Sequence, residues 1–148
     1  MWNRRSRTAA ALVLVAGLGL AGCGQSAGSG TSGEKPAKVE KPAGAQTATV
    51  TLTELAVKRL DIKTVAVRDE PLAGQQRKVI PYSAVLYDPQ GQAWAFTNPQ
   101  PLTYVRQRIS VDQISGDMAV LIDGPGSGTT VVTVGAAELY GAELGVGK

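Results

Sequence analysis

Cys23 has the most distinctive chemistry in this chain, because it supplies the only thiol among 148 residues. A single cysteine excludes a disulfide within the chain, even in a compartment that would permit one. Leu20, Ala21 and Gly22 lead directly into it, a leucine and two small residues. Two interpretations follow: a sulfur that carries a covalent group, or a buried free cysteine.

The residues before Cys23 have the layout of a secretory signal peptide. Met1–Arg7 carries three arginines and no acid, and Thr8–Leu20 is an uncharged, mostly apolar run of 13 residues. That run is shorter than the roughly 18–20 residues that span a bilayer. We therefore expect residues 1–22 to be an export signal rather than an uncleaved membrane helix. Arg4-Arg5 leaves the choice between the general and the twin-arginine export route open.

Leu20-Ala21-Gly22-Cys23 resembles the lipobox of bacterial lipoproteins. In that family the cysteine sulfur is lipidated and the chain is cut before it. The resemblance implies that Cys23 is the lipid attachment site and the mature N-terminus. It also implies that the protein is anchored to the extracytoplasmic face of the bacterial cell membrane, with the choice of membrane left open.

The net positive charge of the chain comes from the predicted export signal. Removal of residues 1–22 takes away three arginines and leaves 12 lysines and arginines against 12 acids. A nucleic-acid-binding domain would show a basic patch, and none is visible here. The chain has no histidine, which removes the usual metal ligand, general base and triad member. We therefore predict a protein that is not an enzyme and has no cofactor, no metal site and no nucleic-acid partner.

Residues 23–46 form the second predicted segment, a lipidated cysteine followed by a flexible linker. Gly24–Ala45 is rich in Gly, Ser, Ala, Pro, Lys and Glu, with Val39 as its only large apolar residue. Such a segment buries too little apolar surface to offset the entropy of ordering. We expect a disordered tether here and a folded domain over residues 47–148.

The pattern from Thr47 onward predicts a mainly β domain, a small antiparallel barrel or sandwich with one or two short helices. Short runs with β-strand alternation, separated by turn residues, are typical of that class. Thr53 is placed to cap a short helix over Glu54–Leu60. The expected strands are Thr47–Leu52, Ile62–Val67, Val79–Tyr87, Gln92–Thr97, Leu102–Val111, Met118–Ile122 and Thr129–Val134; loops are expected at Asp69–Arg77, Asn98–Pro101 and Asp123–Gly128, and a brief helix within Gly135–Leu144.

Several stretches together resemble one domain of the periplasmic adaptor subunits of efflux systems, the membrane fusion proteins of the RND/HlyD type. Leu52–Thr64 is similar to the segment that enters their membrane-proximal domain. Ile80–Asp88 and Gln92–Phe96 are similar to the strands that re-enter it, and Val131–Leu139 to its closing strand and tail. The order of these pieces carries the resemblance, which covers nearly all of Thr47–Val146.

In that family a long insertion separates the two halves: a second barrel, a lipoyl-like domain and a helical hairpin. Here only Asp69–Arg77 lies between them. The resemblance therefore implies a membrane-proximal domain that stands alone and cannot bridge an envelope. What it carries over is packing against the extracytoplasmic face of a transport permease, and fold alone does not settle that function.

Trp94, Tyr104, Arg106 and Arg108 are the candidate partner-binding residues, because aromatic residues and arginine are enriched in binding hot spots. The alternatives are core or rim packing for the aromatic residues and a solvated strand face for the arginines. Two functions remain open. The first is an efflux-related accessory protein that binds a permease or a full-length adaptor subunit, and the second is an envelope lipoprotein that binds a small ligand or an ion.

Overall fold

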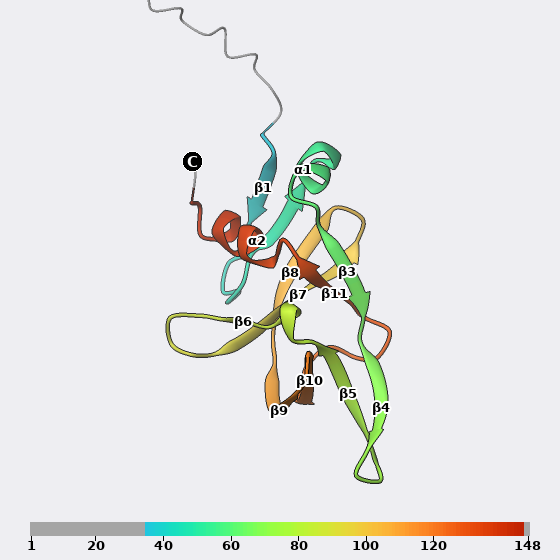
Figure 1. Cartoon of the computed structure of the whole chain (residues 1–148). Helices are drawn as coiled ribbons and strands as arrows, with labels where there is room; N and C mark the ends of the chain where they lie inside the picture. Colours follow the sequence, from blue (N-terminus) through green and yellow to red (C-terminus); the bar gives the residue numbers. More distant parts are fainter. Residues whose placement is uncertain (1–34, 147–148) are drawn as a thin grey trace, which may run out of the picture. The chain divides into compact units, whose positions relative to one another are not determined.

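The computed structural model describes residues 35–146, which form mainly β structure (Figure 1). The predicted signal, the lipobox Leu20–Cys23 and the first part of the predicted linker lie outside the described residues. Two antiparallel sheets and two short α-helices confirm the predicted fold class. Within the described chain neither sheet closes into a barrel, so the sandwich alternative describes the architecture better than the barrel.

The larger sheet has seven strands in the order β1-β2-β8-β7-β11-β3, with β6 paired to β7. Their bounds are β1 (Ala37–Glu40), β2 (Thr49–Leu52), β8 (Thr103–Arg108), β7 (Ala93–Gln100), β11 (Thr130–Val134), β3 (Lys63–Ala66) and β6 (Leu86–Tyr87). The smaller sheet runs in the order β4 (Arg68–Leu72), β5 (Gln75–Pro81), β10 (Met118–Asp123) and β9 (Ser110–Ser115). The helices are α1 (Glu54–Arg59), the 3-10 turn η1 (Tyr82–Ala84) and α2 (Ala136–Glu143).

Two buried residues mark two of the places where the chain passes from one sheet to the other. Val67 separates β3 from β4, and Ile109 separates β8 from β9. Both side chains point into the apolar cluster that also holds Ile80 and Leu121 of the smaller sheet and Val131 of the larger one. The chain therefore bends at these two residues, and their buried side chains belong to the core that both sheets share.

A second apolar cluster lies between the larger sheet and the two helices. Val50, Phe96 and Tyr104 contribute from the sheet, and Leu139 contributes from α2. The α1 helix begins as predicted, because the Thr53 hydroxyl accepts a hydrogen bond from the Ala56 N–H at 3.2 Å. The helices thus cover one face of the larger sheet while the smaller sheet packs toward the other.

The expectation of a flexible linker up to residue 46 is wrong for Ala37–Glu40, which form β1. These residues pair antiparallel with β2, and Val39 lies opposite Val50. Ala37 and Val39 pack against the cluster under the helices, while Lys38 and Glu40 point to solvent. The folded unit therefore begins before Thr47. The sequence did not indicate this strand because its alternation covers only four residues, which are surrounded by Pro, Lys and Glu.

The expected loop at Asp69–Arg77 is also wrong, because these residues form most of the β4–β5 hairpin. Its two-residue turn, Ala73-Gly74, has positive φ at both positions, 51° and 78°. That conformation matches the twist of a hairpin but is normally marked by Asn-Gly or Asp-Gly. Pro71 is tolerated because β4 is an edge strand.

Three further boundaries differ from the sequence-based prediction. The expected strand Leu102–Val111 divides at Ile109 into β8 and β9, and the expected strand Val79–Tyr87 is interrupted by η1. The break expected at Asn98–Pro101 is instead the end of β7, where a register shift between Thr97 and Gln100 accommodates Pro99. In each case a buried side chain or an irregular register overrides the local alternation.

Candidate functional site

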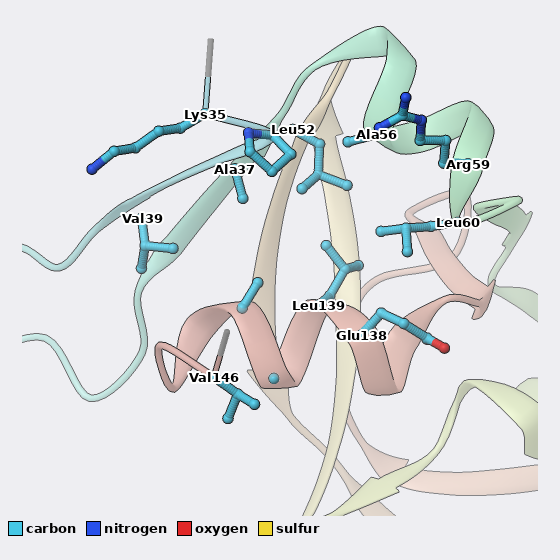
Figure 2. A pocket seen from close by; sticks show the side chains of 13 residues that line it. Lys35, Ala37, Val39, Leu52, Ala56, Arg59, Leu60, Glu138, Leu139 and Val146 are labelled. Atoms are coloured by element: carbon cyan, nitrogen blue, oxygen red, sulfur yellow. The ribbon is translucent and has the colours of Figure 1, made fainter. Parts of the chain in front are cut away.

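A groove of about 680 Å³ lies between α1, β1 and α2 (Figure 2). Residues from three separated parts of the chain line it. They are Lys35, Pro36, Ala37, Val39, Leu52, Ala56, Arg59, Leu60, Glu138, Leu139, Gly141, Ala142 and Val146. Small residues on both helices, Ala56 on α1 and Gly141 and Ala142 on α2, leave the space between them open.

The lining of the groove is apolar apart from three charged residues. Lys35 and Arg59 bring positive charge, and Glu138 on α2 brings one negative charge. In Figure 2 these three side chains lie at the margins, while Leu52, Leu60 and Leu139 occupy the middle. Such a surface can bind an aliphatic group. Its middle has no hydrogen-bonding side chains that could bind a sugar or a nucleotide.

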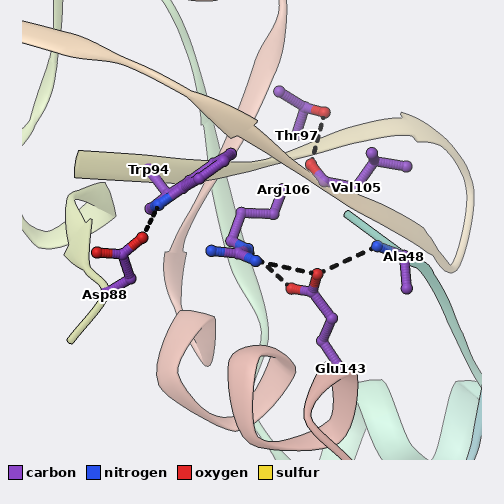
Figure 3. Close-up of polar contacts among 7 residues, drawn as sticks. All are labelled: Ala48, Asp88, Trp94, Thr97, Val105, Arg106 and Glu143. Atoms are coloured by element: carbon purple, nitrogen blue, oxygen red, sulfur yellow. Dashed lines mark hydrogen bonds and ion pairs between the residues drawn. The ribbon is translucent and has the colours of Figure 1, made fainter. Parts of the chain in front are cut away.

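A buried ion pair fixes α2, which forms one wall of the groove (Figure 3). Arg106 on β8 donates from Nε to Glu143 Oε2 at 2.9 Å and from Nη2 to Oε1 at 3.3 Å. The side chains are only 10% and 5% exposed. Glu143 Oε1 also accepts a hydrogen bond from the Ala48 N–H at 3.1 Å, so one carboxylate joins α2 to β8 and to the start of β2.

The Arg106 guanidinium also stacks on two aromatic rings. Its central carbon lies 4.2 Å from the ring centre of Trp94 and 4.9 Å from that of Tyr140 on α2. These are distances at which a cation is attracted to an aromatic face. Trp94 Nε1 in turn donates to Asp88 Oδ2 at 2.9 Å, and this hydrogen bond lowers the pKa of the Asp88 carboxyl below its ordinary value. Backbone N–H groups of Gln92 and Gln90 act in the same direction.

The four predicted partner-binding residues occupy different environments. Trp94 and Arg106 are brought together in the stack just described, and both are largely buried. Tyr104 lies in the core under the helices, where burial raises the pKa of its hydroxyl. Arg108 is exposed and lies directly across the strand pair from Trp94. Of the four, Arg108 is the side chain that a partner can reach without rearrangement.

Aspartate side chains on β9 and β10 are dispersed and engaged in other contacts. Asp112 on β9 pairs with Arg77 at 2.7 Å, and Asp123 accepts a hydrogen bond from the N–H of Gly124. Across residues 35–146, no three Asp or Glu side chains come together in a way that could hold a metal ion. No helix in this same part of the chain has the length and apolar character needed to cross a membrane.

Comparison of the chain with protein-family models, curated proteins and solved structures returned no significant match. The candidate site therefore rests on its own geometry. Sequence reasoning missed the groove because its walls come from residues 35–39, 52–60 and 138–146. Only two features of the sequence could have indicated the groove. One is Val39, a single large apolar residue in a polar segment, and the other is the small residues on the two short helices.

Proposed function

We propose that this protein is a lipid-anchored, extracytoplasmic accessory protein that binds a transport permease, in a role related to efflux. The anchor is supported by the lipobox-like residues Leu20–Cys23, and the role by the resemblance to adaptor subunits. The observation that carries the proposal is the position of the apolar surface. Lys35, which lines the groove, follows Cys23 by only 12 residues in the chain. Val146 lines the groove and is 74% exposed, and Leu55, which precedes the lining residue Ala56 on α1, is 56% exposed.

The length of chain between Cys23 and Lys35 limits how far this surface can lie from an anchor. Twelve residues, fully extended, reach at most about 43 Å. A lipid on Cys23 would therefore keep Lys35, which lines the groove, within that distance of the bilayer. The extracytoplasmic loops of a permease, or the membrane-proximal domain of a full-length adaptor, lie in the same zone.

Site-specific photo-crosslinking in cells tests this function. A crosslinker at Leu55 should capture a polytopic transport protein or an adaptor subunit. A crosslinker at Gln76, an exposed position in the β4–β5 hairpin, serves as the matched control. Capture of a transport component from Leu55 alone supports the proposal. Failure to recover any transport component above background from Leu55 refutes it.

A second function, binding of a small ligand in the envelope, is favoured by one specific observation. The groove volume of about 680 Å³ falls within the roughly 300–1,000 Å³ typical of small-molecule sites. Its apolar lining favours an organic ligand over an ion. Native mass spectrometry of the protein extracted from cell envelopes should show a co-purified small molecule. A mass that corresponds to the lipidated protein alone, under conditions that retain weak ligands, would count against this second function.

A further inference from the structure

We propose that the groove between α1, β1 and α2 binds a single long aliphatic chain that ends in a carboxylate, such as a fatty acid. This inference deepens the second function above by naming the chemical class of the ligand. It rests on three properties of the groove: its volume, its apolar floor and the sign of the charge at its margins.

The volume and the floor define the body of the ligand. A space of about 680 Å³ is enough for one flexible alkyl chain. The side chains along its middle, among them Leu52, Leu60 and Leu139, carry no hydrogen-bonding group. Each methylene that is buried adds to the affinity, so the affinity should rise with the length of the chain.

The charges at the margins define the head group. Lys35 and Arg59 outnumber Glu138, so the lining carries a net positive charge. Among the described residues no carboxylate lies within ion-pair distance of Arg59. A carboxylate head group at the α1 margin therefore gains a cation without displacing an internal partner. Because Arg59 is exposed, its contribution is modest and decreases with salt.

Gly141 provides a way to close the groove without disturbing the fold. A Cβ added at this position would meet only Val146 Cβ, at 3.9 Å, so there is room for a side chain. Glycine within a helix is also less favourable than alanine. Gly141→Leu should therefore fill the groove while the domain stays folded, and Gly141→Ala is the matched control that changes the helix but adds little volume.

The test uses the chain from residue 23 onward with Cys23→Ser, so that the protein is unlipidated and keeps the whole folded unit. Sodium dodecanoate, below its micellar concentration, is titrated by calorimetry, and thermal unfolding confirms that each variant is folded. We expect saturable one-to-one binding, about tenfold weaker for decanoate, which lacks two methylenes. Gly141→Leu should lose binding at least tenfold, whereas Gly141→Ala should bind within twofold of the parent.

The head group is tested by two substitutions with opposite expected effects. Arg59→Gln should weaken dodecanoate binding about threefold, and Glu138→Gln should tighten it by a similar factor. Neither should change the affinity for dodecanol, which has the same chain and no charge. Arg68→Gln, at an exposed cation outside the groove, controls for net charge.

Four outcomes would overturn the inference. Dodecanoate that does not bind, or that binds equally well to a folded Gly141→Leu variant, excludes the groove as the site. Equal affinity for dodecanoate and dodecanol shows that the charged residues at the margin do not select a carboxylate head group. If the native protein instead carries a neutral or branched ligand, the class named here is wrong while the small-ligand function still holds. Loss of dodecanoate binding leaves the permease proposal untouched, because crosslinking from Leu55 tests that function separately.

Discussion

Replacement of Glu143 should destabilise the domain strongly, because this carboxylate is the buried partner of Arg106. In Glu143→Ala the guanidinium remains covered by Trp94 and Tyr140, now without a counter-charge. The Ala48 N–H also loses its acceptor. Removal of one member of a buried ion pair typically costs about 3–5 kcal/mol. For a domain of this size that corresponds to a decrease in Tm on the order of 15 °C.

Glu143→Gln separates the charge from the hydrogen bonds. The amide oxygen can still accept from Ala48, but the charge that favours Arg106 is gone. We expect about half the loss seen with alanine, since hydrogen bonds to charged groups contribute roughly 1.5–3 kcal/mol. Urea unfolding followed by circular dichroism gives both values, and an unchanged m-value would show that the variants unfold from the same compact state.

The exposed pair Arg77–Asp112 is the matched control for this prediction. Its 2.7 Å separation is shorter than that of Arg106–Glu143, but its side chains are 28% and 43% exposed. Surface pairs contribute about 0–1 kcal/mol, so Asp112→Ala should change the Tm by only a few degrees. If Asp112→Ala and Glu143→Ala cost the same free energy of unfolding, the reasoning from burial is refuted.

Three further predictions follow from single sites. Trp94→Phe removes the donor to Asp88, so the pKa of that carboxyl should rise in an NMR titration. Because the folded-state pKa is lowered, Asp88 stabilises the fold above its ordinary pKa, and that stability is lost as the pH falls below about 4; an unchanged titration in the variant would contradict this. Gly135→Ala should cost at least about 1–2 kcal/mol, since φ is 87° and the new Cβ would collide with Ile62, whereas Gly91→Ala, with φ at 76° in open space, should cost less. Intact-mass analysis of the envelope protein should show a chain that begins at a lipidated Cys23; a bare sulfur with residues 1–22 still attached would exclude the proposed anchor.

The parts of the fold that sequence reasoning predicted well depend on hydrogen bonds between near neighbours. The Thr53 cap closes over three residues, to Ala56. The turn between the expected strands Val79–Tyr87 and Gln92–Thr97 is held by the carboxylate of Asp88, which accepts from the N–H groups of Gln90 and Gln92 at 3.0 and 2.8 Å. Such hydrogen bonds depend on residue type and short spacing, so they can be located from the amino-acid sequence alone.

The parts that it missed depend on partners far away in the chain. Ala37–Glu40 becomes a strand because β2 offers it an edge and the helices offer Ala37 and Val39 a core. The turn at Ala73 adopts a positive φ that alanine does not favour by itself, and the pairing of β4 with β5 imposes it. Composition describes what a segment prefers in isolation, and here the tertiary contacts reverse that preference.

The groove depends on local residue type and on a distant ion pair, so its stability test and its ligand-binding test are linked. Arg106 and Glu143 are 37 residues apart, and no local pattern connects them. Their ion pair nevertheless holds the last turn of α2, which also carries Gly141 and Ala142 into the groove, and Leu139 lies directly before that turn. Loosening α2 through Glu143→Ala should therefore weaken dodecanoate binding together with stability, whereas Gly141→Leu should weaken binding at least tenfold in a domain that unfolds no earlier than the parent. A ligand affinity that follows stability in both variants would place the binding site elsewhere.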